Sequence, residues 1–377
     1  MCLSPTKAEV EEYIKVEFQP ISADLLVADG GKSTKVLEEW QKDLHSSIHC
    51  RLKGVNPVEK GWKATADQVC ITAEEVCLML ERYPPGKRDQ RRKHLERSTD
   101  KANYIINVLL GRIPTKYYRD IERPAFDISD SQYQAFLQDA ISQLLNSDPA
   151  KVMYNLFYLP GKIRCINDQG RLPKNLKEQR SENLPAMQCM RSGTWNDRYG
   201  FICVFGHSPQ DSTSALSKES IKKADLAIER KGPQTSTKFI TSGGSVRPFL
   251  TPVVEAFELK KHLAERGIHK DCILTDAASE HTNTNVWNAA LLAYEAGMPF
   301  DKQMIAFLIP DQFEYVRDEM KQRTKEELQP NLYDYLIIEP STEFPNSIVI
   351  GFKESFKTCP KQRLQWRNHV GRGIGLV

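Results

Sequence analysis

The amino-acid sequence predicts an α/β protein with a Rossmann-like, mainly parallel sheet flanked by helices, preceded by a mostly α-helical N-terminal domain. Before residue 160, apolar residues recur at the spacing of helices, most clearly in residues 129–146. After residue 199, short apolar runs alternate with amphipathic segments. Strands that alternate with helices form parallel sheets through right-handed crossovers, which is why the second half predicts a layered α/β domain.

The N-terminal domain is expected to span residues 1–160. Within it, Thr72 and Glu75 have the spacing of a capping box ahead of an apolar stretch. Residues 161–198 change character, because they are polar, contain scattered Gly and Pro and show little periodicity. We therefore expect an irregular linker or lid there, with the domain boundary inside it.

Residues 199–355 form the expected α/β domain. Short apolar runs that end at turn residues predict strands, and apolar residues at every third or fourth position predict helices. The expected strands are 199–206, 237–244, 271–276, 303–310, 333–340 and 347–352. The expected helices are 220–231, 252–267, 283–297 and 314–328. The last residues, 356–377, are basic and poor in structure signals, and we expect a tail.

Composition narrows the class of protein. The chain has 377 residues, 40% of them hydrophobic, which is enough for two domains with their own cores. No run approaches about 20 apolar residues and no secretory leader pattern is present, so we expect a cytoplasmic protein without a membrane span. A non-canonical secretion signal would leave no trace in these patterns. Nine cysteines without a CxxC pair favour buried thiols over disulfides or zinc, and no metal site is predicted.

The candidate site lies where the expected strands end. In a parallel sheet, ligands bind beyond the carboxyl ends of the strands. Gly206-His207, Ser242-Gly243-Gly244 and the polar segment 276–285 all follow strands. Glycines let a ligand approach backbone N–H groups, the next helix offers its positive end, and Arg247 adds a fixed charge. We therefore expect a phosphate or carboxylate there, with a ligand-free tight turn as the alternative.

The residue types suggest roles within this site. The expected ligand-binding residues are Gly206, Ser242, Gly243, Gly244, Arg247, Ser279, Thr282 and Asn285. The expected catalytic residues are Glu255, His207 and His281. A carboxylate in the first turn of a helix can act as a base, bind a ligand hydroxyl or cap the helix. Each imidazole can transfer protons near neutral pH or simply donate a hydrogen bond.

The order of these motifs resembles the YdcF-like family, which includes SanA and ElyC. The matching segments are Phe205-Gly206-His207, Ile221-Lys222-Lys223-Ala224, Ser242-Gly243-Gly244, Glu255-Ala256 and Ser279-x-x-Thr282-x-x-Asn285. The resemblance covers about residues 199–320 and implies a Rossmann-like domain whose chemistry is mostly unassigned. It also implies that Arg317 binds ligand, since an arginine commonly follows the fourth strand in the family.

The chain departs from the family pattern at four positions. His207 replaces a glycine, His281 replaces an asparagine, and Thr284 replaces a glutamate. Glu314 stands where relatives have a histidine. If that histidine does chemistry in the family, this protein does something different, or His207 or His281 has taken its role.

We expect an enzyme that transfers or hydrolyses a group on a phosphorylated or nucleotide-like small molecule. The cofactor is undetermined, and S-adenosylmethionine or another nucleotide-like ligand is a candidate. One alternative is a non-catalytic ligand-binding or protein-interaction module that contacts a protein partner through the helical domain. Another is a host-directed effector or natural-product enzyme that uses the same strand ends.

Nucleic acid is not an expected partner. The net charge of +3 is too small to indicate one by itself. The basic run at 87–94 contains no aromatic residue and has acidic residues on either side, which favours a solvated helix face.

Overall fold

The computed structural model describes most of the second half of the chain and short parts of the first. The described residues are 171–207, 209, 213–231, 237–247, 251–329, 331–358 and 365–366, with 72–81, 103–108 and isolated positions before them. The chain divides into two compact units, one formed by Met1–Pro173 with Arg367–Val370 and the other by Lys174–Trp366 with Gly371–Val377. Nearly all of the predicted helix 129–146 and of the basic run at 87–94 lies outside the described residues.

Helix α4, Ala73–Glu81, begins at the capping box that the sequence predicted. The Thr72 hydroxyl accepts a hydrogen bond from the Glu75 N–H at 3.2 Å. The Glu75 carboxylate accepts one from the Thr72 N–H at 2.7 Å. The two residues therefore satisfy each other's backbone donors at the helix start, as the motif requires.

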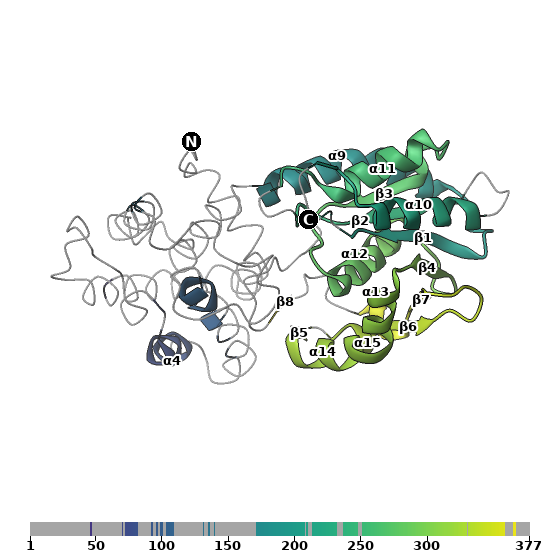
Figure 1. Cartoon of the computed structure of the whole chain (residues 1–377). Coiled ribbons are helices and arrows are strands. Elements are labelled where there is room, and N and C mark those ends of the chain that lie inside the picture. Colours follow the sequence, from purple (N-terminus) through teal and green to yellow (C-terminus); the bar gives the residue numbers. More distant parts are fainter. Residues whose placement is uncertain are drawn as a thin grey trace. The chain divides into compact units, whose positions relative to one another are not determined.

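A six-stranded sheet forms the centre of the second unit, with strand order β3-β2-β1-β4-β7-β6 (Figure 1). The strands are β1 (Tyr199–Phe205), β2 (Phe239–Ser242), β3 (Ile273–Asp276), β4 (Gln303–Phe307), β6 (Leu336–Pro340) and β7 (Ser347–Phe352). The first four in the order are parallel, and β7 runs antiparallel to both β4 and β6. The predicted α/β fold with a mainly parallel sheet is confirmed.

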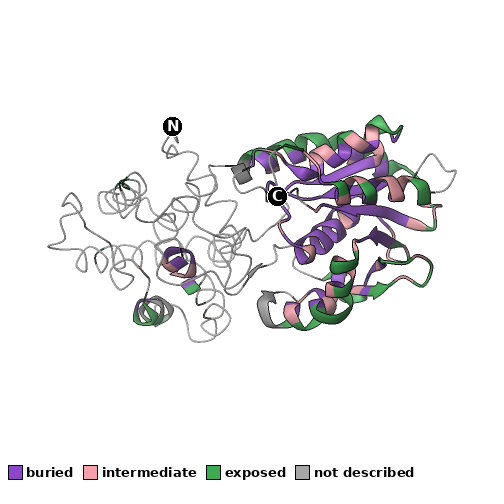
Figure 2. Cartoon of the chain, in the orientation of Figure 1, coloured by how far each residue is buried: buried purple, intermediate pink, exposed green. Residues whose placement is uncertain are grey.

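Helices cover both faces of this sheet. Helices α10 (Lys218–Arg230) and α11 (Glu255–Glu265) pack on one face with Ile202, Val204 and Phe239. Helix α12 (Thr282–Glu295) packs on the other face around Trp287. Figure 2 shows the strands buried between the helices, with exposed outer faces on α10 and α11, whereas α12 is buried along most of its length. No helix within the described part of the chain is both long and apolar enough to cross a membrane.

The segment predicted to be irregular contains a long helix instead, α9 (Arg171–Ser192). The buried side chains of α9 follow a helical spacing, and they are Asn175, Gln179, Asn183, Ala186 and Met190. Three of the five are amides, so the apolar periodicity that identifies a helix from sequence is missing. The prediction of irregular structure was wrong for residues 171–192 for this reason, and residues 161–170 lie outside the described residues.

The amides of α9 pair with the backbone of the edge strand β3. The Asn183 side chain accepts from the Thr275 N–H at 2.8 Å and donates to the Thr275 carbonyl at 2.7 Å. Gln179 Oε1 accepts from the Ala277 N–H at 2.7 Å. An edge strand exposes unpaired backbone groups, and α9 satisfies these groups as a neighbouring strand would.

Several predicted element boundaries differ from the structure. The helix predicted over 314–328 begins earlier and is continuous through α13 (Pro310–Glu314), a π-helical turn (Tyr315–Glu319) and α14 (Met320–Glu327). The strand predicted over 333–340 begins with a helical turn, α15 (Leu332–Tyr335), which Asn331 caps by accepting from the Tyr333 N–H at 3.2 Å. Short 3-10 helices occupy Lys270–Cys272 and Glu354–Lys357.

Part of the predicted tail also has structure. Strand β8 (Gln365–Trp366) pairs antiparallel with β5 (Leu328–Gln329) in a separate two-stranded sheet. This strand could not be predicted from the sequence, because two residues are too few to show an alternating pattern.

Candidate functional site

Three predicted strand ends lie side by side. Phe205, Ser242 and Asp276 are aligned across β1, β2 and β3, because Phe205 pairs with Ser242 and Ser242 pairs with Asp276. The residues that follow these three therefore start at one edge of the sheet, where α/β proteins bind ligands. We call this edge the rim, and it comprises residues 206–207, 243–247 and 277–285.

A buried carboxylate joins two of the strand ends. Asp276 Oδ2 accepts a hydrogen bond from the Ser242 hydroxyl at 2.6 Å and another from the Ser279 hydroxyl. Asp276 Oδ1 accepts from the Ala278 N–H at 3.2 Å and from the Asn288 amide at 3.1 Å. Burial raises the pKa of this carboxyl against the lowering effect of the hydrogen bonds. The hydroxyl protons of the two predicted serines are thus used within the protein.

The other two predicted residues of this segment lie in the first turn of α12. Asn285 is buried, and its Oδ1 lies 2.9 Å from Ser242 Oγ. Thr282 is the first residue of α12 and is half-buried. Asn288 lies one turn after Asn285, and no role was predicted for it from the sequence. That spacing is the signal that could have placed Asn288 beside the strand ends.

The two glycines after β2 have a different role from the one predicted. The Gly243 N–H donates to the Asp276 carbonyl at 3.0 Å, and the Gly244 N–H donates to the Ser279 carbonyl at 2.7 Å. These N–H groups are therefore not available to an anion, and that part of the prediction was wrong. A Cβ on Gly244 would lie 3.1 Å from the carbonyl oxygens of both Ala277 and Ser279. Glycine is needed here because the neighbouring loop approaches closely.

The backbone N–H groups at the start of α11 are also paired within the protein. The N–H groups of Glu255 and Ala256 donate to the Gly244 and Gly243 carbonyls at 3.4 and 2.8 Å. We predicted that an anion binds at this end of α11. The first N–H groups of the helix are already paired within the protein, so they are not available to an anion.

The Glu255 side chain binds the residue that follows β1. Its Oε1 accepts a hydrogen bond from the His207 N–H at 2.8 Å and from the Ser220 hydroxyl at 2.7 Å. On the other side of the same peptide unit, the Lys223 ammonium group donates to the Gly206 carbonyl at 3.3 Å. Two of the predicted residues, Glu255 and His207, are thus in direct contact.

Lys223 was missed as a site residue by the sequence analysis. It is 3% exposed, and burial lowers its pKa to about 8, although Glu255 and Glu219 oppose this shift. Lys223 Nζ also donates to Gln312 Oε1 at 3.0 Å. The buried face of α10 consists of Ser220, Lys223, Ala224 and Ala227. This i, i+3, i+4, i+7 spacing, with a lysine inside it, was the available signal.

The positive charges of the rim act on both predicted histidines. Burial lowers the pKa of His207, and nearby Lys223 and Arg247 lower it further. Burial lowers the pKa of His281 to about 3, with contributions from Arg323 and Arg247. Both imidazoles are therefore neutral at pH 7. Arg247 acts on both, so it lies near two histidines that come from different strand ends.

The π-helical turn brings two further side chains to the start of α12. The Tyr315 hydroxyl donates to Asn283 Oδ1 at 2.8 Å, and Asn283 is the second residue of α12. The Arg323 guanidinium lies 5.8 Å from the centre of the Tyr315 ring. π-Helical turns are frequent at functional sites, and this one places an aromatic hydroxyl next to the rim, with the Arg323 guanidinium of α14 near its ring.

Arg317, the arginine that the family resemblance selected, has a different environment. Its Nε donates to the neighbouring Asp318 carboxylate at 2.6 Å, and both side chains are about half exposed. The guanidinium also lies 5.8 Å from the Phe313 ring. The described contacts of Arg317 are therefore all with its own helical segment, and none joins it to the strand ends.

The donor types at the rim suit an organic anion better than a metal. In the described ranges, no group of three or more His, Cys, Asp or Glu side chains is arranged to hold a metal ion. The cations Arg247 and Arg323 are instead the groups that could face a phosphate or carboxylate.

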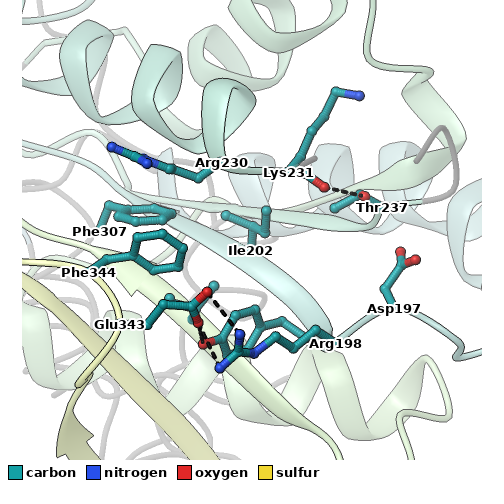
Figure 3. Close-up of a pocket in the computed structure, with 11 residues that line it drawn as sticks. Asp197, Arg198, Ile202, Arg230, Lys231, Thr237, Phe307, Glu343 and Phe344 are labelled. Carbon is teal, nitrogen blue, oxygen red and sulfur yellow. Dashed lines mark hydrogen bonds and ion pairs between the residues drawn. The ribbon is translucent and has the colours of Figure 1, made fainter. Parts of the chain in front are cut away.

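A separate hollow of about 170 Å³ lies away from the rim (Figure 3). Ile202 lines this hollow, and Arg198 forms an ion pair with Glu343 at 2.9 Å on one side. Arg230 lies over the Phe344 ring at 5.4 Å on the other side. None of the residues predicted from the sequence to bind ligand lines this hollow.

Comparisons of the chain with protein-family models, with curated proteins and with solved structures found no match in any of the three.

Proposed function

We propose that the rim binds a small anionic molecule, phosphorylated or nucleotide-like, and that the protein transfers or hydrolyses a group on it. The observation that supports this most directly is the electrostatic effect of Arg247, which follows β2 at the rim. Its charge acts on both His207 and His281, which follow β1 and β3. One anion near Arg247 would therefore meet groups from both of these loops, as ligands of open α/β sheets do.

The chemistry of these groups fits such a reaction. A guanidinium stays charged at all physiological pH values and binds phosphate or carboxylate through two parallel hydrogen bonds. A neutral imidazole can accept a proton from water or from a substrate hydroxyl. An anion bound beside His207 would raise the pKa of its imidazole, because a nearby negative charge favours the protonated form. Ligand binding would thus make His207 a better proton acceptor.

The other predicted groups have supporting roles in this proposal. Glu255 orients His207 through the backbone, and Asp276 holds Ser242 and Ser279 in place. The resemblance to the YdcF-like family supports a Rossmann-like ligand site at the same strand ends. S-adenosylmethionine is included as a nucleotide-like candidate because it carries an adenosine and a carboxylate, although its sulfonium and ammonium groups make it a net cation.

The experiment is a ligand screen followed by a turnover assay. Purified protein is tested by thermal shift and calorimetry against nucleotides, phosphorylated metabolites, inorganic phosphate and S-adenosylmethionine. Every compound that binds is then incubated with the protein, and its conversion is followed by ³¹P NMR or mass spectrometry. We expect binding and conversion of at least one compound. Binding without conversion would favour the non-catalytic alternative, and binding by none would overturn the proposal.

A matched pair of variants tells the rim from the hollow of Figure 3. Arg247→Ala removes the central charge of the rim, whereas Arg230→Ala removes an exposed arginine of the hollow. We expect only Arg247→Ala to weaken binding. If only Arg230→Ala weakens it, the ligand occupies the hollow and the rim proposal fails.

A further inference from the structure

Three helices converge on a single peptide unit at the end of β1. The Gly206 carbonyl accepts hydrogen bonds from Lys223 of α10 and from Gln312 Nε2 of α13, each at 3.3 Å. The His207 N–H donates to Glu255 of α11 at 2.8 Å. Both ends of the Gly206–His207 peptide unit are thus held by side chains, none of which comes from a neighbouring strand.

The charges match the dipole of this peptide unit. A cation stands at the carbonyl oxygen and a carboxylate stands at the N–H, which are the favourable positions for each charge. The hydrogen bond between Lys223 and Gln312, at 3.0 Å, joins the two donors to one another. The carbonyl of His207 is held as well, because the hydroxyl of Ser217 donates to it. The backbone that bears the His207 ring is therefore fixed on all sides.

We propose that Lys223 is the positioning residue of the rim, which holds the Gly206–His207 peptide so that the neutral His207 imidazole faces the bound anion. The proposal rests on the proposed function for the identity of that anion. Lys223 itself is buried and its two described acceptors are protein atoms, so it acts through His207 and not on the ligand. A merely space-filling lysine would need neither a charge nor these two acceptors.

The titration of Lys223 gives a measurable change that tests the proposal. The charged groups that face it are Glu219 on its own helix and Glu255 on α11, with Gln312 as the neutral contact from α13. Burial lowers the pKa of Lys223 to about 8. Because the Lys223 charge also lowers the pKa of His207, the two side chains are electrostatically coupled. Loss of the lysine proton near pH 8 therefore changes the surroundings of the His207 ring.

The test follows the His207 ring and the Gly206 carbonyl by ¹³C NMR between pH 5 and 10, without ligand. The His207 signal is assigned with a His207→Gln variant. We expect both signals of the wild-type protein to shift a second time near pH 8. In Lys223→Met, that second shift should be lost and the pKa of His207 should rise. Lys223→Arg should keep the low pKa of His207, since the charge is retained.

Lys222→Met serves as the control, because Lys222 is exposed on the same helix. It should leave both signals as in the wild type. No shift near pH 8 in the wild-type protein would overturn the proposal even if Lys223→Met failed to fold. The proposal would also be overturned if Lys222→Met and Lys223→Met had the same effect on the two NMR signals. These signals are measured without ligand. The ligand screen can therefore fail while the coupling between Lys223 and His207 is observed, and the coupling can be absent while a ligand binds.

Discussion

The Glu255 carboxylate fills the space beside Gly206 into which a β-carbon would project. A Cβ placed on residue 206 would lie 2.1 Å from Glu255 Oε2 and 2.3 Å from its Cδ. The carboxylate cannot move aside without losing its hydrogen bonds to His207 and Ser220. Gly206→Ala should therefore lower the free energy of unfolding by about 1–3 kcal/mol, as overpacked sites do. Urea denaturation followed by circular dichroism measures this loss.

The Glu255→Ala variant tests whether the carboxylate causes the loss of stability in Gly206→Ala. In Glu255→Ala the carboxylate is absent, so adding Gly206→Ala should cost much less than it costs the wild type. The expected coupling between the two positions is about 0.5–3 kcal/mol. Additive losses would mean that Glu255 is not what keeps a side chain out of position 206.

The amides of α9 give a second prediction. Asn183→Leu leaves the buried N–H and carbonyl of Thr275 without their described partner. Each unsatisfied group costs about 1–3 kcal/mol, so the melting temperature should fall clearly. Gln188→Leu makes the same change at an exposed position of α9 and should alter stability by less than about 0.5 kcal/mol. Equal melting temperatures for the two variants would contradict the pairing of α9 with β3.

These positions show why sequence reasoning found the sheet and missed parts of its surroundings. The strands around Phe201, Ile240 and Leu274 are buried on both faces, so they read as continuous apolar runs. Helix α9 buries amides, whose side chains read as solvent-exposed. Lys223 was overlooked for the same reason, because a lysine seldom lies on a buried face.

The arrangement of the candidate site could be predicted only in part. Strand ends are visible in sequence, so the gathering of His207, Ser242 and His281 at one edge could be predicted. The partners of individual N–H groups depend on loop conformation, and the donors of Gly243 and Gly244 were therefore misassigned. The π-helical turn departs from regular helical spacing. The different environments of residues 317 and 323 could therefore not be predicted from a helical pattern in the sequence.

His281 makes stability depend on pH in the acidic range. Its pKa is about 3 in the folded protein and about 6.5 in an unfolded chain, so the unfolded state takes up the proton first. Its contribution to stability is therefore complete above pH 6.5 and falls as the pH drops from 6.5 to 3. The expected loss is about 1.4 kcal/mol per pH unit over that range. Thermal or urea unfolding at several pH values measures it.

Carboxyl groups titrate in the same range, so the comparison must be with a variant. His281→Asn keeps a residue that caps helices well and removes the titrating ring. The stability of wild type minus that of His281→Asn should decrease steadily between pH 6.5 and pH 3. A difference that does not change with pH would show that His281 has the same pKa in the folded and the unfolded protein, which would contradict the lowered pKa.

The two arginines that the sequence proposed for the ligand should behave differently. Arg247 acts on both rim histidines, whereas Arg317 is exposed and pairs with Asp318. A charge-assisted hydrogen bond contributes about 1.5–3 kcal/mol, so Arg247→Ala should weaken binding of the ligand found by the screen about 10- to 150-fold. Arg317→Ala should leave affinity within about twofold, because an exposed pair contributes little. Calorimetric titration of both variants, beside their melting curves, separates lost contact from lost folding. Equal losses of affinity would place Arg317 at the ligand after all, and unchanged affinity in Arg247→Ala would remove Arg247 from the site.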